Sequence, residues 1–296
     1  MAEKVLVLGG SRYFGKRLVQ LLASAGQYQV TVATRGLTKM EFAGEVQQVV
    51  LDRTDERALR EVAQSGPWDI VYDNICYSPN EALAAVQAFE GQVGRYIVTS
   101  SASVYDFLDH PLVEADFDPY HEELKMGDRD DFGYAEGKRL VEAVFMQKAK
   151  FPVCAMRIPI VLGPDDYTRR LHFHVEHVQQ GLPIGIPNPE AGISFITSGE
   201  VASFMKWLGS ASITGPVNGS SDGAVTIGQI IKMIEQATGK AAHIVPETEE
   251  AHMSPFGIPT SWTMDTAKAQ AEGFSFRSVQ EWLPELVQEI ASIHRI

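Results

Sequence analysis

Short apolar runs alternate with amphipathic stretches along the first half of the chain. The apolar runs have strand length and predict strands at residues 5–8, 29–33, 46–51, 70–73 and 96–99. The stretches between them show a helical period of apolar positions and predict helices at 15–25, 56–63 and 79–89. Strands that alternate with helices indicate an α/β fold built on a doubly wound parallel sheet.

The second half of the chain begins regularly and then changes character. A helix at 134–150 and a buried strand at 153–158 continue the pattern, whereas proline and glycine recur after Gly163. Further helices are expected at 198–208, 227–238 and 278–293. We therefore expect a larger domain over 1–163, joined by later segments from about 193–225, and a smaller C-terminal α+β lobe, mainly within 164–296, that binds the substrate.

Composition indicates an ordinary globular protein and narrows its partners. Of the 296 residues, 45 % are hydrophobic and 21 % are charged, which permits a sizeable core. The formal net charge of −13 opposes general binding to nucleic acid or to anionic membranes, although a local cationic pocket is compatible with it. No apolar run approaches the roughly 18 residues of a membrane span.

The two cysteines and the N-terminal residues favour a cytoplasmic location. Cys76 and Cys154 both lie in apolar segments, as the buried thiols of a reducing compartment do. The chain enters its first strand without the basic and then apolar segments of a secretion signal. We therefore expect a cytoplasmic protein.

The stretch "LVLGGSRYFGKRL" (6–18) places glycines between the first strand and the first helix. In a Rossmann fold, glycines at this turn permit a tight bend and a close approach of the backbone to a pyrophosphate at the helix N-terminus. The alternative is a plain turn whose glycines serve only packing. The cofactor contacts expected from this turn are Gly9, Gly10, Arg12, Tyr13, Phe14 and Gly15.

The end of the second strand, "VTVATRG", favours NADP over NAD as the cofactor. NAD-binding chains usually place Asp or Glu there to bind the ribose 2'-hydroxyl, but this chain has Thr34 followed by Arg35. A carboxylate would repel a 2'-phosphate, whereas arginine binds one in a forked geometry, so we expect Arg12 and Arg35 to clamp it. Asp52, shortly after the third strand, is placed to meet the adenine amino group, with Arg53 beside it. NAD is the alternative cofactor, with Arg35 as a solvated loop charge.

Two further stretches, "VTSSASVY" (98–105) and "YAEGK" (134–138), hold the candidate catalytic residues. Tyr134 and Lys138 are four residues apart and share one face of a helix, where a nearby ammonium favours the phenolate and lowers the Tyr134 pKa. Tyr134 would act as acid or base, Lys138 would also hold the nicotinamide ribose, and Ser101 would orient the substrate oxygen. The alternative is an amphipathic helix with a surface Tyr–Lys pair.

These motifs occur in the order found in the short-chain dehydrogenase/reductase superfamily, which the chain resembles in its extended, epimerase/dehydratase-like branch. "RIPIVLGPDD" (157–166) is similar to the family's R-x-x-x-V-x-G-P, and "FITSGEVA" (195–202) is similar to F-I-x-V-x-D-V-A. "DTAKAQAEGFSFRSVQEWL" (265–283) resembles the C-terminal motif D-x-x-K…L-G-F-x-P-x-x-x-x-E-x-L, so the resemblance covers nearly the whole chain. The turn "GGSRYFG" resembles an atypical subgroup that includes chloroplast stem-loop RNA-binding proteins.

The resemblance implies further cofactor contacts and an assembly. Asn74 and Ile75 would line the cofactor after the fourth strand, and residues near Pro159 would border the nicotinamide. The helices at 79–89 and 134–150 would form a two-fold interface, so a homodimer is expected.

Two departures from the family argue against a standard nucleotide-sugar substrate. Nucleotide-sugar epimerases usually have Asn where this chain has Ile160 and Arg where it has Ile193, and both family residues contact the substrate diphosphate. Isoleucine has no donor for a phosphate. Arg169, Arg170 or Arg277 are the candidates to substitute for these contacts.

A histidine-rich stretch, "HFHVEH" (172–177), differs in spacing from H-E-x-x-H and from its inverted form. We expect no metal site and interpret it as a helix face beside the substrate pocket, with a solvated helix as the alternative. Trp262 and Met264 are interpreted as core residues, with closure of the substrate pocket as the alternative, and "DRDD" (128–131) as a polar loop before the catalytic helix.

The combined prediction is an NAD(P)-dependent oxidoreductase or epimerase that transfers hydride at a hydroxyl or carbonyl carbon of a small substrate, sugars included. The preference for NADP favours net reduction over epimerisation. A dehydratase would usually place acidic residues after the active-site serine, where this chain has Ala102 and Ser103, so dehydration is disfavoured. The second hypothesis is a non-catalytic NADP-binding module, regulatory or RNA-associated, which the intact Ser101–Tyr134–Lys138 set and the negative charge oppose.

Overall fold

A parallel sheet forms the centre of the larger domain. The computed structural model describes residues 2–38 and 40–293. Within them, a seven-stranded sheet has the order β11–β6–β5–β4–β1–β2–β3, and its neighbouring strands are parallel. In sheet order the strands are β11 (Gly215–Asn218), β6 (Val153–Ile158), β5 (Val93–Ser101), β4 (Trp68–Asp73), β1 (Glu3–Leu8), β2 (Tyr28–Thr34) and β3 (Val46–Val50). The predicted doubly wound Rossmann architecture is confirmed.

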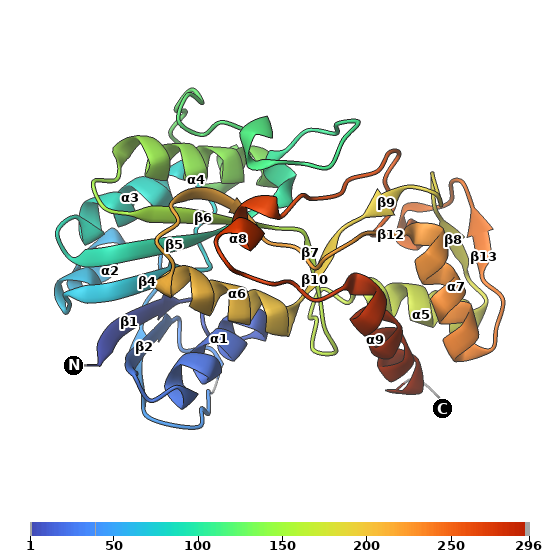
Figure 1. The fold of residues 1–296 in the computed structure, drawn as a ribbon, viewed down its shortest axis with the longest axis horizontal. Helices are drawn as coiled ribbons and strands as arrows, with labels where there is room; N and C mark the ends of the chain where they lie inside the picture. Colours follow the sequence, from blue (N-terminus) through green and yellow to red (C-terminus); the bar gives the residue numbers. More distant parts are fainter. Residues whose placement is uncertain (1, 39, 294–296) are drawn as a thin grey trace.

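Helices cover both faces of this sheet (Figure 1). On one face lie α1 (Tyr13–Ser24) and α6 (Ser198–Ser210), and on the other lie α2 (Glu56–Gln64), α3 (Pro79–Phe89) and α4 (Tyr134–Lys148). Successive residues of β1 enter opposite layers: Val5 and Val7 belong to the core under α1 and α6, and Leu6 and Leu8 to the core under the other helices. Burial on both faces explains why β1 is a continuous apolar run.

The C-terminal lobe has a core of its own. Its helices are α5 (Arg170–Gln180), α7 (Ile227–Thr238) and α9 (Val279–Ile293), whose apolar faces pack together. Its short strand pairs are β8 (Pro183–Gly185) with β13 (His243–Val245) and β9 (Gly192–Ile193) with β12 (Val225–Thr226). A third pair lies at the junction of the lobe and the sheet. Its strands are β7 (Ile160–Leu162), which follows β6, and β10 (Phe195–Thr197), which precedes α6.

Segments from the second half of the chain return to the sheet. After β10, the chain forms α6 against α1 and then β11 beside β6. It returns again at α8 (Ala267–Ala271), next to β11, before α9 ends in the lobe (Figure 1). Single-turn helices lie at Ala102–Val104, Glu114–Asp116, Arg129–Asp131 and Glu250–His252. In the described part of the chain, no helix is both long and apolar enough to cross a membrane.

The sequence pattern missed the shortest elements and misplaced some boundaries. The paired strands of the lobe have two or three residues each, too few to show any period. Helix α1 begins at Tyr13, two residues before the predicted start, and β5 extends over Val93–Ser101 rather than 96–99. The extension of β5 matters because it places Ser101 at the very end of a strand.

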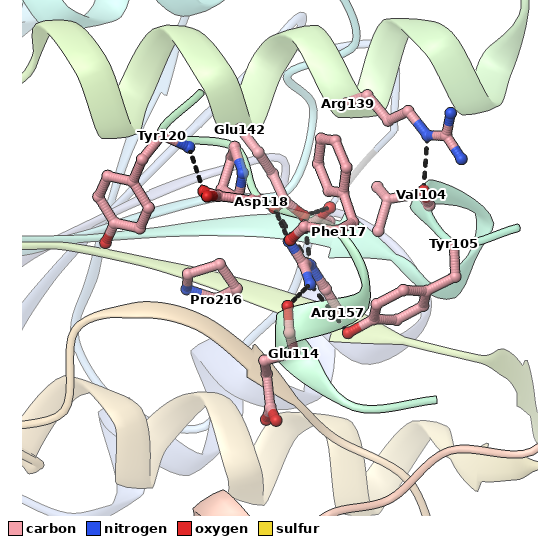
Figure 2. Close-up of polar contacts among 12 residues, drawn as sticks. Val104, Tyr105, Glu114, Phe117, Asp118, Tyr120, Arg139, Glu142, Arg157 and Pro216 are labelled. Carbon is pink, nitrogen blue, oxygen red and sulfur yellow. Dashed lines mark hydrogen bonds and ion pairs between the residues drawn. The ribbon is translucent and has the colours of Figure 1, made fainter. Parts of the chain in front are cut away.

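A fully buried ion pair joins the sheet to α4. Arg157 on β6 and Glu142 on α4 are both inaccessible to solvent, with Nη2 and Oε2 at 2.6 Å (Figure 2). Arg157 Nε also donates to the Glu142 carboxylate, and the Ser100 hydroxyl donates to the same group. Charges this deeply buried are tolerated only when every hydrogen-bonding group is satisfied.

The remaining donors of Arg157 bind the irregular segment after β5. Nη1 donates to the Tyr105 hydroxyl and to the Glu114 carbonyl, both at 2.9 Å, and Nη2 donates to the Phe117 carbonyl at 3.0 Å (Figure 2). Tyr105 in turn donates to Asn218 Oδ1 on β11 at 2.6 Å. All five N–H groups of Arg157 therefore have acceptors. Its bonds to Tyr105, Glu114 and Phe117 hold the segment that follows Ser101 against β6.

Replacing Glu142 by Gln should destabilise the protein strongly, because it leaves the Arg157 charge buried and unpaired. We expect a loss of about 3–5 kcal/mol in the free energy of unfolding, measured by urea denaturation. Glu61→Gln is the matched control, since Glu61 forms an exposed ion pair with Arg57 at 2.9 Å and its loss should leave stability unchanged. Equal stability of the two variants would contradict the assigned role of the buried pair.

Candidate active site

Two cavities meet at the carboxyl ends of the parallel strands, where ligands bind in doubly wound sheets. The turn cavity, of about 430 Å³, surrounds the Gly9–Gly15 turn. The Tyr134 cavity, of about 420 Å³, lies beside the end of β5 and the start of α4. The cavities share Tyr13, Asn74 and Arg129 in their walls, so one extended ligand can occupy both.

The glycine turn is shaped by close packing as well as by its conformation. Gly9 has φ +82°, which favours glycine, and an added Cβ there would lie 2.6 Å from Ile75 Cγ2. An added Cβ on Gly15 would lie 2.4 Å from the Gly9 carbonyl oxygen. An added Cβ on Gly10 would lie 2.6 Å from Val32 Cγ2 and 2.8 Å from Val19 Cγ2. Packing of α1 against the turn and β2 therefore requires these glycines.

The N-terminus of α1 is open toward the turn cavity. The helix begins at Tyr13 with no side-chain cap and no acidic residue in its first turn, so its free N–H groups and positive dipole end are not neutralised. Tyr13 has a left-handed φ of 53° and donates from its hydroxyl to the Val161 carbonyl at 2.8 Å. Burial raises the pKa of Tyr13, which keeps this hydroxyl a donor. The bond fixes the turn against β7.

Basic side chains line the outer end of the turn cavity. Arg12 and Arg35 both lie in its wall, as the sequence predicts, and Arg12 Nη2 is 3.5 Å from Thr38 Oγ1. Asp52 lies in the same wall and accepts from the backbone and hydroxyl of Thr54, which lowers its pKa; Arg35 adds to this effect. Arg35 and Asp52 are thus close enough to face one ligand from two sides.

The floor of the turn cavity is a buried polar network. Arg53 pairs with Asp73 at 2.8 Å, and the Tyr96 hydroxyl donates to the same carboxylate at 2.7 Å. Asn74 donates to the Gly9 carbonyl at 3.1 Å and accepts from the Thr99 hydroxyl at 2.8 Å. The side chain of Asn74 thereby connects the glycine turn to β5.

Ser101, Tyr134 and Lys138 converge on the Tyr134 cavity. Tyr134 is the first residue of α4, and its side chain is 57 % exposed at the cavity wall. A hydrogen bond with Ser101 and the charges of Arg170 and Arg129 act to lower its pKa, but desolvation on the cavity side outweighs them and the pKa of Tyr134 is raised above its ordinary value. Tyr134 is therefore protonated at neutral pH.

Lys138 does not have the predicted effect on Tyr134. Its Nζ donates to the carbonyls of Cys76 at 2.8 Å and Thr99 at 2.9 Å, and it lies 6.0 Å from the centre of the Tyr134 ring. Burial also lowers the pKa of Lys138 itself. The prediction of a lowered Tyr134 pKa is wrong because desolvation of the phenol dominates, while the ammonium is directed to backbone carbonyls.

Some of the other predicted residues line the Tyr134 cavity and others lie away from it. Pro159 and Ile160 line the Tyr134 cavity, but Ile193 is buried in the core of the C-terminal lobe. The histidines of 172–177 do not line it, which corrects the prediction of a helix face beside the pocket: His174 bonds Ser254 at 2.7 Å and His177 bonds His252 at 3.0 Å. Among the described residues no metal-binding cluster is found.

Sequence reasoning missed aromatic and basic residues that the fold brings to the site. The Arg129 guanidinium lies 4.3 Å from the centre of the Tyr77 ring, and both residues line both cavities. Tyr167 also lines both, with its ring edge-on to Tyr13 at 5.9 Å. Trp262, predicted as a core residue, packs partly against the small core around Tyr105 and also lines the Tyr134 cavity. In the sequence, the only feature that pointed to a role for Arg129 at the site is its position shortly before the helix that begins at Tyr134.

Comparison with known proteins agrees with this geometry. Residues 5–80, which contain the glycine turn, Asp52 and Asn74, match the NAD dependent epimerase/dehydratase family. The match covers residues 5–80 of the 296, the part of the chain that holds β1 to β4, and it indicates a nicotinamide dinucleotide site there.

Solved structures share the fold over nearly the full length of the chain. A putative epimerase from Burkholderia cenocepacia J2315 has a TM-score of 0.76 and 17 % identity, with 98 % of each chain covered. The UDP-glucose 4-epimerase of Thermus thermophilus, solved as a complex with NAD, has a TM-score of 0.72 and 17 % identity, covering 99 % of this chain and 100 % of that one. At this identity the likeness establishes the fold alone.

Two proteins with similar sequences have names that describe different functions, one a stem-loop binding protein and the other a reductase. The chloroplast stem-loop binding protein of 41 kDa b from Arabidopsis thaliana is 25 % identical over 305 residues, which cover 96 % of this chain and 75 % of the relative. The 2'-dehydrokanamycin reductase of Streptomyces kanamyceticus is 33 % identical over 100 residues, which cover 34 % of this chain and 28 % of the relative.

Substituting Gly15 by Ala should damage the glycine turn, because the new methyl group would meet the Gly9 carbonyl oxygen at 2.4 Å. We expect a loss of about 1–3 kcal/mol in stability and weaker dinucleotide binding, measured by thermal unfolding and by NADPH fluorescence titration. Gly199→Ala is the control, since its added Cβ approaches no neighbour closer than 4.0 Å. Unchanged NADPH binding by the Gly15 variant would disprove the role assigned to the turn.

Proposed function

We propose that the chain is an NADP(H)-dependent oxidoreductase or epimerase of the extended short-chain type, which transfers hydride at a hydroxyl or carbonyl carbon of a small substrate. The observation that supports this most directly is the convergence of Ser101, Tyr134 and Lys138 on a cavity continuous with the glycine turn. A proton donor, an orienting hydroxyl and an ammonium thus surround the place where the reacting end of a dinucleotide would lie.

The residues of the turn cavity fit an NADP molecule. The open N-terminus of α1 suits the pyrophosphate, and Arg12 and Arg35 suit a 2'-phosphate. Arg53 also lines the turn cavity and adds a positive charge beside the proposed nucleotide. Asp52 remains the proposed contact to adenine. NAD is the alternative cofactor, and it is the one bound in the Thermus thermophilus relative.

The residues of the Tyr134 cavity would hold the nicotinamide end. Two of the three N–H donors of Lys138 are used by carbonyls, and the third remains for the nicotinamide ribose. Asn74 and Pro159 line the same cavity and would border the ring. When bound there, the nicotinamide supplies or accepts a hydride at C4.

Tyr134 and Ser101 would complete the chemistry in the direction of reduction. The Tyr134 hydroxyl would give its proton to the carbonyl oxygen of the substrate, and Ser101 would donate a hydrogen bond to the same oxygen. The raised pKa keeps that proton available at neutral pH. In oxidation Tyr134 must first lose the proton, so the raised pKa favours reduction. Likeness to 2'-dehydrokanamycin reductase supports the same direction.

A second candidate is a non-catalytic, RNA-associated NADP-binding module. Likeness to the chloroplast stem-loop binding protein over nearly the whole chain favours it. The net charge of −13 and the intact set of Ser101, Tyr134 and Lys138 oppose it. We therefore rank the enzyme first.

Arg35→Ala should weaken NADPH binding and leave NADH binding nearly unchanged. Loss of a charge-assisted contact to the 2'-phosphate costs about 1.5–3 kcal/mol, which a side-by-side fluorescence titration with both cofactors measures. If NADH binds the unmodified protein as well as NADPH does, the assignment of Arg12 and Arg35 is wrong and a cofactor-recycling epimerase becomes the better proposal.

Tyr134→Phe should reduce turnover by on the order of 10²–10⁴-fold, while NADPH binding persists. Because the pKa of Tyr134 is raised, the unmodified enzyme should keep its rate of carbonyl reduction around neutral pH and should oxidise alcohols faster as the pH rises, a trend that the variant should lose. Undiminished activity of Tyr134→Phe on any turned-over substrate would refute the catalytic assignment.

A further inference from the structure

The Tyr134 cavity is positively charged in a strongly acidic protein. Three cationic residues, Arg129, Lys138 and Arg170, line it, and no carboxylate side chain of the described residues does. The chain as a whole has a formal net charge of −13. A cavity with this local sign selects an anionic ligand, because nearby charges in a partly enclosed site act more strongly than the distant field.

Two of these cations already have other partners. Lys138 is bonded to two backbone carbonyls, and its remaining donor is assigned above to the cofactor. Arg129 stacks on Tyr77 and lines both cavities, so it lies where the cofactor passes from one to the other. Arg170 lines the Tyr134 cavity but not the turn cavity. It is therefore the cation best placed for the substrate.

The three arginines considered as replacements for lost phosphate contacts have different positions. Arg169 forms an ion pair with Glu176, and Arg277 lines a separate cavity between α1 and α6. Only Arg170 reaches the catalytic cavity, and its guanidinium has no hydrogen-bond or ion-pair partner within residues 2–38 and 40–293. Its charge also acts on Tyr134, so the guanidinium and the phenol are near one another.

The start of α5 adds to the positive character of this wall. Arg170 is the first residue of α5, a helix with no side-chain cap and no acidic residue in its first turn. The free N–H groups at that end and the guanidinium have the same sign. In contrast, Ile160 and Trp262 offer mainly apolar surface to the cavity. One side of the substrate is thus expected to be charged and another apolar.

We propose that the substrate is a small hydroxy or oxo compound with a carboxylate or phosphate group, and that Arg170 binds this group while the reacting oxygen meets Ser101 and Tyr134. The inference rests on the function proposed above. A guanidinium binds either anion with two parallel hydrogen bonds, which would fix the carbon to be reduced or oxidised relative to the nicotinamide. The cavity of about 420 Å³ must also hold the nicotinamide end, which favours a small substrate over a nucleotide sugar.

The test is ligand binding to the protein saturated with NADP⁺, measured by isothermal titration calorimetry. One arm uses carboxylates (glycerate, gluconate and glucuronate), and a second uses phosphates (glycerol 3-phosphate and glucose 6-phosphate). The uncharged counterparts glycerol, sorbitol and glucose form the third arm, and UDP-glucose the fourth. At least one small anion should bind about tenfold or more tightly than its uncharged counterpart, and the better arm identifies the anionic group.

Variants at neighbouring arginines then assign the contact. Arg170→Gln should weaken binding of that anion by about tenfold or more, Arg170→Lys should restore part of it, and Arg169→Gln should leave it unchanged. NADPH binding should be the same in all three, which shows that the cofactor site and the fold are intact.

Three results would overturn the inference while the proposed function stands. They are NADPH binding without binding of any small anion, equal binding of the uncharged compounds, and an equal loss in Arg169→Gln and Arg170→Gln. Tight binding of UDP-glucose that does not depend on Arg170 would also overturn it, in favour of a nucleotide sugar. Absence of NADPH binding would instead refute the proposed function itself, and this inference with it.

Discussion

The buried pair of Arg157 and Glu142 is the interaction on which the walls of the Tyr134 cavity depend. One guanidinium joins β6, α4 and the irregular segment that follows Ser101, using all of its donors (Figure 2). Ser101 lies where β5 ends and Tyr134 where α4 begins, so the distance between these side chains depends on how firmly α4 is held to the sheet. Because an unpaired charge at this depth would cost several kcal/mol, alternative placements of α4 are strongly disfavoured.

A second network of buried polar side chains holds the walls of the turn cavity in place. Asn74 bonds the Gly9 carbonyl on one side and the Thr99 hydroxyl on the other, and Asp73 next to it holds Arg53 beneath the turn. The Lys138 ammonium is anchored by the carbonyls of Cys76, in the loop after β4, and of Thr99, within β5. The shared walls of the two cavities are therefore held by hydrogen bonds. A dinucleotide that lay across both would meet polar groups whose positions are already fixed, so little reorganisation would accompany binding.

The Tyr134 cavity differs from the protein as a whole in the sign of its charge, and it shifts the pKa of Tyr134. The protein is acidic overall, yet the cavity around Tyr134 has only cationic side chains among its charged lining. Desolvation there raises the pKa of Tyr134 despite a neighbouring lysine and arginines, because removing water from a phenolate costs more than charges at this distance return. The same environment keeps Tyr134 protonated at neutral pH and places the Arg170 guanidinium in the cavity wall.

The sequence by itself determined the doubly wound sheet, the glycine turn and the membership of Ser101, Tyr134 and Lys138 in one site, because periodic burial and short motifs are local properties that follow from neighbouring residues. It did not determine the paired strands of two or three residues in the lobe, the direction of the Tyr134 pKa, or which of three arginines reaches the cavity. Those depend on the directions of side chains in the folded molecule: Arg169 and Arg170 are adjacent in the chain, yet Arg169 pairs with Glu176 while Arg170 lines the same cavity as Tyr134. Desolvation and the direction of a side chain are set by what surrounds a residue in space, and only the tertiary structure supplies that.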